Sequence, residues 1–253
     1  MYCHLPMVKG KDGQKLSKRH GDTAVRDFRA KGYLPEAILN YVTLVGWSLD
    51  GETEFFTKEE LEKCFKLENI HVSSGTFDYK KLDWFNGQYI RMKSDEEIVC
   101  LITPYLQKAG YISESVSDDE KALLLKLAPA VRERMKVLSD AVPLSAFLFK
   151  DEPCTDRTQY IAKGMTEESA KEAFRRGAEI VLANEKAGKT FSETESEIKA
   201  LSEEMGVKIN GIFQPIRVAI TASTVSLPLH DSISLLGIEE TERRINRAIE
   251  FFC

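Results

Sequence analysis

The segment KLSKRHG, Lys15–Gly21, marks the point where a short extended start gives way to a chain dominated by helix signals. It places three cationic side chains, Lys15, Lys18 and Arg19, within five residues, with Ser17 between them. Lysine ammonium groups act as compact point charges against phosphate oxygens, so this composition suits a loop that closes over a polyphosphate. From composition alone, the alternative is an exposed, solvated turn.

The overall composition is that of a soluble globular protein with one large domain or two to three small ones. The 253 residues are 43% hydrophobic and 30% charged, which is enough for a substantial core. No apolar run approaches the roughly 18 residues that a membrane span needs, and no signal peptide opens the chain. The five cysteines are scattered and form no CxxC pair, so we expect neither disulfides nor a zinc site. We expect a cytoplasmic protein with reduced thiols.

The charge is unevenly distributed along the chain. The net charge is −5, yet residues 1–34 carry eight Lys or Arg against three Asp, whereas the remainder carries 27 against 37 acidic residues. The first segment is therefore a local attractor for anions on an acidic body. Any nucleic-acid contact further along must come from individually placed arginines rather than from a general positive field.

Helix start signals recur through the rest of the chain. A Ser or Thr followed three residues later by Glu predicts a capping box, in which each side chain satisfies a free backbone donor. Such boxes occur at Thr57/Glu60, Ser94/Glu97, Ser117/Glu120 and Ser192/Glu195. Helical spacing also predicts a helix that ends at Lys108 and Gly110. It predicts a final helix as well, with an apolar face of Ile245, Ala248, Ile249 and Phe252 and with Arg243 and Arg247 on another face.

Prolines and β-branched residues refine this assignment. Pro35, Pro129 and Pro215 each suit the first turn of a helix. Residues 216–221 alternate like a strand, but the proline before them favours a helix. A strand is indicated only for residues 2–8, which feed the cationic loop. The predicted fold is mainly α, with a short β remnant at the amino terminus and breaks near residues 92–94 and 150–153.

The cationic loop resembles the KMSKS signature of class I aminoacyl-tRNA synthetases, and KLSKRHG is the form typical of glutamyl-tRNA synthetases. Later blocks strengthen the resemblance because they follow in family order along essentially the whole chain. They are GYLPEAILNYVTLVGWS (Gly32–Ser48), FDYKKLDWFNGQYIR (Phe77–Arg91), NGIFQPIRVAIT (Asn210–Thr221) and SLLGIEETERRINRAIEFF (Ser234–Phe252). The chain is thus similar to the carboxy-terminal half of a bacterial-type glutamyl-tRNA synthetase.

The resemblance implies three parts. Residues 1–93 would hold the end of a class I catalytic domain and a helical stem-contact domain, and residues 94–164 and 165–253 two helical anticodon-binding subdomains. The intact enzyme would be a glutamate–tRNA ligase that uses ATP in two steps. Its H-x-G-H signature does not occur within these 253 residues. We therefore expect this chain alone to bind tRNA without aminoacylating it, as one half of a longer enzyme.

For the nucleotide site, the resemblance implies that Lys15 and Lys18 act in catalysis by offsetting triphosphate charge, with Lys18 as the principal contact. Ser17 and Arg19 complete the ATP-binding loop. Magnesium is expected with the ATP, held largely by its phosphates.

For the anticodon, the resemblance implies that an arginine on the helix after Pro129 reads a base. Either Arg132 or Arg134 fits this role, and Arg132 shares a helix face with Lys136, four residues on. The alternative for these residues is an ordinary solvated helix surface.

Two further anticodon contacts follow from the carboxy-terminal blocks. Arg217 occupies the arginine of the Q-P-x-R block, and Leu229 is expected to pack against a base. The loop between them departs from the family, since Ala222 replaces a usual glycine. Asn86 and Arg91 are expected to contact the tRNA stem.

The aromatic residues nearby have two interpretations. Trp84, Phe85 and Tyr89 are able to stack on bases, but Leu82, Phe85 and Tyr89 are spaced as the core face of a helix. We expect the core role.

The implied partners are tRNA(Glu), glutamate and ATP, with no membrane and a monomeric state; whether tRNA(Gln) is also charged stays open. One alternative is a helical interaction module unrelated to tRNA, although the sequence has no internal repeat. Another is a glutaminyl-type or short glutamyl-queuosine paralogue. By family resemblance the former carries β-barrels here and the latter lacks the helical region, so strand content discriminates between them.

Overall fold

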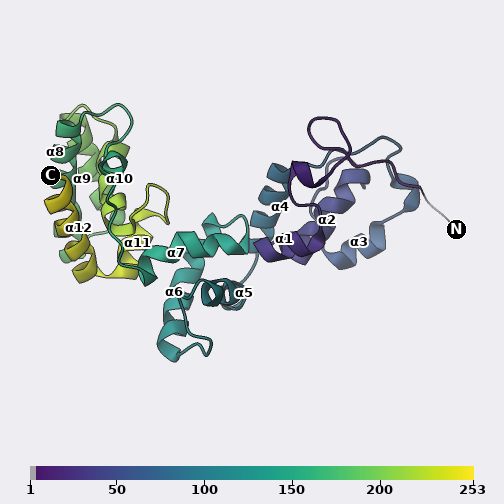
Figure 1. The fold of residues 1–253 in the computed structure, drawn as a ribbon, viewed down its shortest axis with the longest axis horizontal. Helices are drawn as coiled ribbons and strands as arrows, with labels where there is room; N and C mark the ends of the chain where they lie inside the picture. Colours follow the sequence, from purple (N-terminus) through teal and green to yellow (C-terminus); the bar gives the residue numbers. More distant parts are fainter. Residues whose placement is uncertain (1–3) are drawn as a thin grey trace. The chain divides into compact units, whose positions relative to one another are not determined.

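The computed structural model describes residues 4–253, and this part of the chain is helical from α1 to α12 (Figure 1). The helices are α1 (Val25–Lys31), α2 (Pro35–Gly46), α3 (Lys58–Cys64), α4 (Tyr79–Arg91), α5 (Asp95–Lys108), α6 (Asp118–Arg134), α7 (Ala141–Phe149), α8 (Glu167–Lys186), α9 (Phe191–Glu204), α10 (Ile209–Thr221), α11 (Leu229–Leu236) and α12 (Ile238–Phe252). A short 3₁₀ turn, η1 (Lys18–His20), precedes α1, and three more, η2 (Leu67–Asn69), η3 (Leu138–Asp140) and η4 (Arg157–Tyr160), lie between the helices. The mainly α prediction is confirmed.

The chain divides into two compact units. Unit 1 comprises the residues up to Tyr105 together with Arg132–Ala141, and unit 2 comprises Leu106–Val131 and Val142–Cys253. Within the described residues, no helix is long and apolar enough to cross a membrane.

The β content at the amino terminus is smaller than predicted. The first residues of the expected strand at 2–8 lie outside the described residues, and His4–Val8 has no regular structure. Instead, Lys9 makes isolated bridges with Lys15 and with Thr76. A lone extended segment needs partners for its backbone groups, and here the bonds are made at its end, by Lys9 with Gly75 and Phe77 and by the Val8 carbonyl with Leu16.

Three of the four predicted capping boxes are present. Thr57 with Glu60, Ser94 with Glu97 and Ser117 with Glu120 each exchange two hydrogen bonds of 2.7–3.2 Å. The fourth prediction, Ser192 with Glu195, is wrong, because Thr190 and Glu193 form the box two residues earlier. Phe191 is thereby helical, and its ring packs against that of Phe213 at 6.1 Å.

The predictions for the three prolines are also confirmed only in part. Pro35 occupies the first turn of α2, as predicted, but Pro129 and Pro215 lie inside α6 and α10. An internal proline removes one backbone hydrogen bond, and the burial of the surrounding residues offsets this loss. Residues 216–221 are helical, as the sequence favoured, with Ile216 and Ile220 fully buried.

Unit 1 is organised around α4. Leu82, Phe85 and Tyr89 are buried, which confirms that this face of the helix is core. The rings of Phe55 and Phe85 stack 4.7 Å apart, and the Tyr89 hydroxyl donates to Asn40 Oδ1 at 2.5 Å. An apolar cluster with one satisfied polar link therefore fixes α4 in place.

Asn86 extends this packing to two other segments. Its Oδ1 accepts from the Leu34 N–H at 2.7 Å, and its Nδ2 donates to the Lys136 carbonyl at 2.6 Å. The side chain has no exposed surface. The structure therefore assigns Asn86 to the core, which corrects the expected contact with a tRNA stem. The sequence alone gave no sign of these two distant partners.

Unit 2 packs α8, α10 and α12 around one core. Gly177 of α8 is required there, since a Cβ at this position would lie 2.2 Å from Ile212 Cγ2 of α10. The predicted face of α12 is buried at Ile245, Ala248 and Phe252.

A buried arginine ties this unit together. Arg244 of α12 is 6% exposed, and its Nη1 donates to the carbonyls of Phe147 at 2.9 Å and Ile220 at 2.8 Å. Its Nε donates to Glu240 Oε1 at 2.6 Å. The guanidinium thus satisfies the carboxy-terminal carbonyls of α7 and α10 while keeping an anionic partner.

The Asn86→Ala variant should destabilise unit 1 by about 1–3 kcal/mol, because it leaves a buried donor and a buried acceptor without partners. Both tryptophans, Trp47 and Trp84, lie in unit 1, so urea unfolding followed by tryptophan fluorescence reports on this unit. The control Asn69→Ala, in the η2 turn, should change the free energy of unfolding by less than about 0.5 kcal/mol. Equal effects of the two variants would contradict the role given to Asn86.

The stability of unit 2 should fall in acid. The hydrogen bond from Arg243, helped by Arg244, lowers the pKa of Glu240 from 4.5 to about 2. Because the folded pKa lies below the unfolded one, the stabilisation is complete above about pH 4.5 and is lost as the pH falls toward 2. We expect Glu240→Gln to flatten this dependence by about 2 kcal/mol, as measured by hydrogen exchange of the α12 amides in urea. The exposed Glu250→Gln should keep the parent's pH profile.

Candidate nucleotide loop and nucleic-acid interface

The cationic segment folds back on itself as a tight loop in unit 1. The Gly10 N–H donates to the Gln14 carbonyl at 2.8 Å, and the Leu16 N–H donates to the Val8 carbonyl at 3.0 Å. Gly13 lies between them with φ 75°, a left-handed conformation that glycine adopts without strain. The turn η1 then carries the remaining cations.

A histidine closes the loop internally. His20 Nε2 lies 3.1 Å from both carboxylate oxygens of Asp12, and its Nδ1 lies 3.0 Å from Ser17 Oγ. The Gln14 N–H donates to Asp12 Oδ1 at 3.0 Å, and this bond, followed by that of His20, lowers the pKa of Asp12. A Cβ on Gly10 would lie 2.6 Å from His20 Cδ2, so the imidazole fits only against a glycine.

The sequence analysis missed His20 and Asp12. The available signal was the histidine three residues after Ser17, the spacing of a short turn that is closed by side chains. Ser17, assigned to ATP, faces this imidazole, and its hydroxyl helps to set the shape of the loop.

The loop cations point toward solvent. Lys15, Lys18 and Arg19 are all exposed, and Arg19 donates a hydrogen bond to the Gln14 side-chain oxygen. Within residues 4–253 neither lysine has an ion-pair partner. Two ammonium groups on a loop braced by His20 are thus available to an anion.

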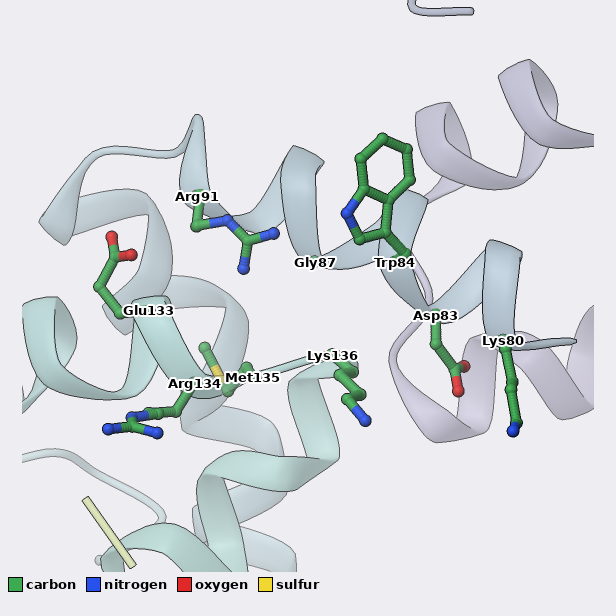
Figure 2. A pocket seen from close by; sticks show the side chains of 9 residues that line it. All are labelled: Lys80, Asp83, Trp84, Gly87, Arg91, Glu133, Arg134, Met135 and Lys136. Atoms are coloured by element: carbon green, nitrogen blue, oxygen red, sulfur yellow. The ribbon is translucent and has the colours of Figure 1, made fainter. Parts of the chain in front are cut away.

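A groove of about 700 Å³ lies within unit 1, between α4 and the segment that follows α6 (Figure 2). Four basic residues line it: Lys80, Arg91, Arg134 and Lys136. Figure 2 shows Lys80, Trp84 and Arg91 along α4, opposite Glu133, Arg134 and Lys136. The groove therefore gathers cations from segments more than 40 residues apart in the sequence.

The acidic residues of the groove do not cancel this charge. Asp83 accepts a hydrogen bond from the Tyr33 hydroxyl, and burial, followed by this contact, raises the pKa of Tyr33. Glu133 is the second acid at the rim. Four cations against two carboxylates leave a net positive wall on an otherwise acidic chain.

Trp84 supplies an aromatic surface beside these cations. Its side chain is 47% exposed, and its inner edge is held against Phe55 at 5.4 Å and Phe85 at 5.3 Å. Fixed aromatic rings next to basic side chains are the usual platform for stacking nucleic-acid bases. Of the aromatic residues considered in the sequence, only Trp84 is placed for such contact, because Phe85 and Tyr89 are buried.

The structure separates the two arginines at the end of α6. Arg132 donates to the Lys93 carbonyl at 3.0 Å and pairs with Asp95 at 2.8 Å, so within unit 1 it links the last turn of α6 to the first turn of α5. Arg134 lines the groove. The predicted shared helix face of Arg132 and Lys136 is wrong, because α6 ends at Arg134; Lys136 lies beyond that end and lines the groove with Arg134.

In unit 2, Arg217 binds the loop that follows α10. Its Nη1 donates to Ser226 Oγ at 2.7 Å and to the Leu227 carbonyl at 2.6 Å. Ala222 ends α10 with φ 54°, the left-handed conformation that a glycine would adopt at lower cost. Leu229 is 4% exposed in the core, which corrects its expected contact with a base. Arg217 thus shapes the loop, and Leu229 anchors it.

A protein-held metal site is not evident in the described chain, where no three His, Cys, Asp or Glu side chains are grouped to hold an ion.

Comparison with known proteins identifies relatives of both parts of the chain. A model of the catalytic domain of class I tRNA synthetases (E and Q) matches residues 1–84, and a model of the anticodon binding domain matches residues 97–249. The chain is 44% identical over 251 residues to the glutamate–tRNA ligase of Borrelia recurrentis, covering 99% of this chain and 49% of that protein. It is 38% identical to the glutamate–tRNA ligase of Treponema denticola, covering 98% of this chain and 52% of that one.

The same relationship holds in three dimensions. A crystal structure of a glutamate tRNA ligase from Elizabethkingia meningosepticum in complex with its amino acid is similar with a TM-score of 0.68 and 26% identity. The similarity covers 99% of this chain and 51% of that one, so the chain spans about half the length of the relatives it matches. Since the anticodon-binding model matches residues 97–249, more than half of its length, the chain belongs to the anticodon binding domain family, and its relatives along nearly all of its residues are glutamate–tRNA ligases.

Proposed function

We propose that this chain is the carboxy-terminal, tRNA-binding part of a glutamate–tRNA ligase, the enzyme that attaches glutamate to tRNA(Glu) in two ATP-dependent steps. The observation that carries the proposal is the succession of a class I catalytic-domain match and an anticodon-binding match along one chain. We keep residues 1–93, 94–164 and 165–253 as the proposed domain boundaries. The alternative, a helical interaction module unrelated to tRNA, gives no reason for a basic groove with an exposed tryptophan.

The loop contributes electrostatic stabilisation in this proposal. Attack of the glutamate carboxylate on the α-phosphate of ATP builds negative charge on the departing pyrophosphate. Lys15 and Lys18 offset that charge, with Lys18 as the principal contact, and preorganised cations of this kind are effective because they need no reorganisation during the reaction. Arg19 binds the same phosphates, Ser17 keeps the loop in shape through His20, and magnesium accompanies the ATP, held by its phosphates.

The groove contributes tRNA binding. Lys80, Arg91, Arg134 and Lys136 bind backbone phosphates, and Trp84 stacks on an unpaired base or packs against a ribose. Arg134, rather than Arg132, is the arginine of this region that contacts tRNA directly. Such contacts have a steep salt dependence because binding releases counterions from the nucleic acid.

In unit 2, the loop after α10 contributes to tRNA binding in this proposal. Arg217 holds Ser226 and Leu227, and the Val225 side chain between the two ends of the loop is 76% exposed. We assign anticodon contact to this loop, with Arg217 as the residue that positions it. The chain acts as a monomer, and binding of tRNA(Gln) beside tRNA(Glu) depends on this surface.

The purified chain should bind tRNA(Glu) with an affinity that falls as the salt concentration rises. Each of Arg134→Ala and Lys136→Ala should reduce the slope of log affinity against log salt by roughly one, because each removes one phosphate contact. Trp84→Ala should cost about 1–3 kcal/mol of binding free energy through lost stacking. Fluorescence anisotropy with labelled tRNA(Glu), repeated with tRNA(Gln), measures these quantities.

The matched control is Lys126→Ala, an exposed lysine of α6 outside the groove. It should leave both the affinity and the salt slope at the parent's values. If the groove variants behave like Lys126→Ala, the groove is not the tRNA site. If the parent itself shows no salt-dependent binding, the interaction-module alternative is favoured.

The chain alone should not aminoacylate. With glutamate, ATP, magnesium and tRNA(Glu), we expect no charged tRNA above the level of an enzyme-free control, because the nucleotide loop is only one part of the catalytic site. Acid-gel separation of charged from uncharged tRNA provides the measurement. Charging at a rate proportional to the chain's concentration would refute this part of the proposal.

A further inference from the structure

Gln88 lies between two residues of the groove in unit 1. Trp84 and Arg91 both line the groove, and Gln88 follows the first by four residues and precedes the second by three along α4. Residues with this spacing share one face of a helix. Gln88 itself is half-buried and is not one of the described residues that line the groove. Any effect of Gln88 on a ligand therefore acts through its two neighbours.

The side-chain amide of Gln88 links these neighbours. Both groups that face it are donors, Trp84 Nε1 and Arg91 Nη2, so the amide turns its oxygen toward them and accepts from each at 3.1 Å. The indole N–H and the guanidinium therefore lie no more than twice that distance apart. Figure 2 shows the indole nitrogen on the side of Trp84 that faces Arg91. One acceptor thus fixes an aromatic ring and a cation side by side.

The hydrogen bond orients Arg91 without neutralising its charge. No salt bridge of residues 4–253 includes Arg91, and Asp95, an acidic residue nearby in sequence, pairs with Arg132 at 2.8 Å. The guanidinium lies over Gly87, where an added Cβ would be 3.5 Å from both Nη atoms. A carboxylate in place of the Gln88 amide would hold the guanidinium as firmly but would cancel its charge. The amide leaves that charge for an anionic ligand.

We propose that Gln88 is a positioning residue, which holds Trp84 and Arg91 ready to bind one unpaired nucleotide of RNA. The base stacks on the indole, and the phosphate of the same nucleotide pairs with the guanidinium. Because both side chains are ordered before the ligand binds, less rotamer entropy is lost on binding. A duplex offers no splayed base to this site. The assignment of the nucleotide to tRNA rests on the proposed function, and the test below does not require it.

The probe is a fluorescently labelled single-stranded oligouridine, compared by anisotropy with the same strand annealed to oligoadenosine. The parent chain should bind the single strand more tightly than the duplex. Gln88→Met keeps the size but removes the acceptor, so it should weaken single-strand binding about threefold to tenfold without changing the slope of log affinity against log salt. Gln88→Glu keeps the acceptor but neutralises Arg91, so it should lower the slope by roughly 0.7, the value for one phosphate contact in a single strand.

The controls separate positioning from folding and from net charge. Asn69→Asp makes the same change of charge as Gln88→Glu, in unit 1 but away from the groove, and should keep the parent's affinity and slope. Urea unfolding of both Gln88 variants should match that of the parent. In a chain that carries Arg91→Ala, Gln88→Met should weaken binding less than it does in the parent, because part of its effect acts through Arg91.

The proposal is wrong if the parent binds duplex as tightly as single strand, if Gln88→Met binds like the parent, or if Gln88→Glu keeps the parent's slope. Anisotropy with tRNA(Glu) on Arg134→Ala and Lys126→Ala judges the proposed function separately. Equal tRNA binding by those two variants, with the effects at Gln88 intact, would support the positioning role and make the groove a site for another RNA. Weaker tRNA binding by Arg134→Ala, with the Gln88 variants like the parent, would refute the positioning role alone.

Discussion

The groove of unit 1 depends on the hydrogen bonds of the buried Asn86 side chain. Its wall comes partly from α4 and partly from the segment after α6, and Asn86 bonds to the Lys136 carbonyl at 2.6 Å. Apolar packing of α4 alone would not fix that segment, because hydrophobic contact is non-directional. A buried amide with both ends satisfied specifies one arrangement and penalises the others. Asn86 shares the positioning of this segment with Asp140, which accepts from the Lys136 and Val137 N–H groups at 2.9 and 3.0 Å.

In unit 2, a buried charged side chain has the role that the Asn86 amide has in unit 1. Arg244 satisfies the carbonyls of Phe147 and Ile220 and keeps Glu240 as its partner. Asp151 lies 3.7 Å from the same Nε, so protonation of Glu240 removes the nearer of two anionic partners and weakens the arrangement. In both units, side chains within the helical core hold the functional loops, and the exposed residues are left to meet ligands.

The sequence predicted most of what depends on local pattern. Capping boxes located the starts of α3, α5 and α6, since the two side chains involved are only three residues apart. The box at the start of α9 was misplaced because Thr190 and Ser192 offer overlapping patterns, and only packing of Phe191 decides between them. Mainly helical architecture, the core face of α4 and that of α12 also follow from spacing alone.

Contacts between residues far apart in the sequence could not be predicted from local sequence patterns. Asn86 sits in a helix that carries a recognisable block, yet its burial is decided by Leu34 and Lys136, about 50 residues away on either side. Arg217 turns toward its own chain because Ala222 ends α10 in the left-handed conformation and brings Ser226 back within reach. The choice between Arg132 and Arg134 likewise required the position of Asp95.

The nucleotide loop combines a braced frame with uncompensated charge. The contacts of His20 with Asp12 and Ser17 hold the backbone without using the lysine side chains. The exposed cations of the loop repel one another, and an anion bound between them relieves that repulsion, so ligand binding and loop order reinforce each other.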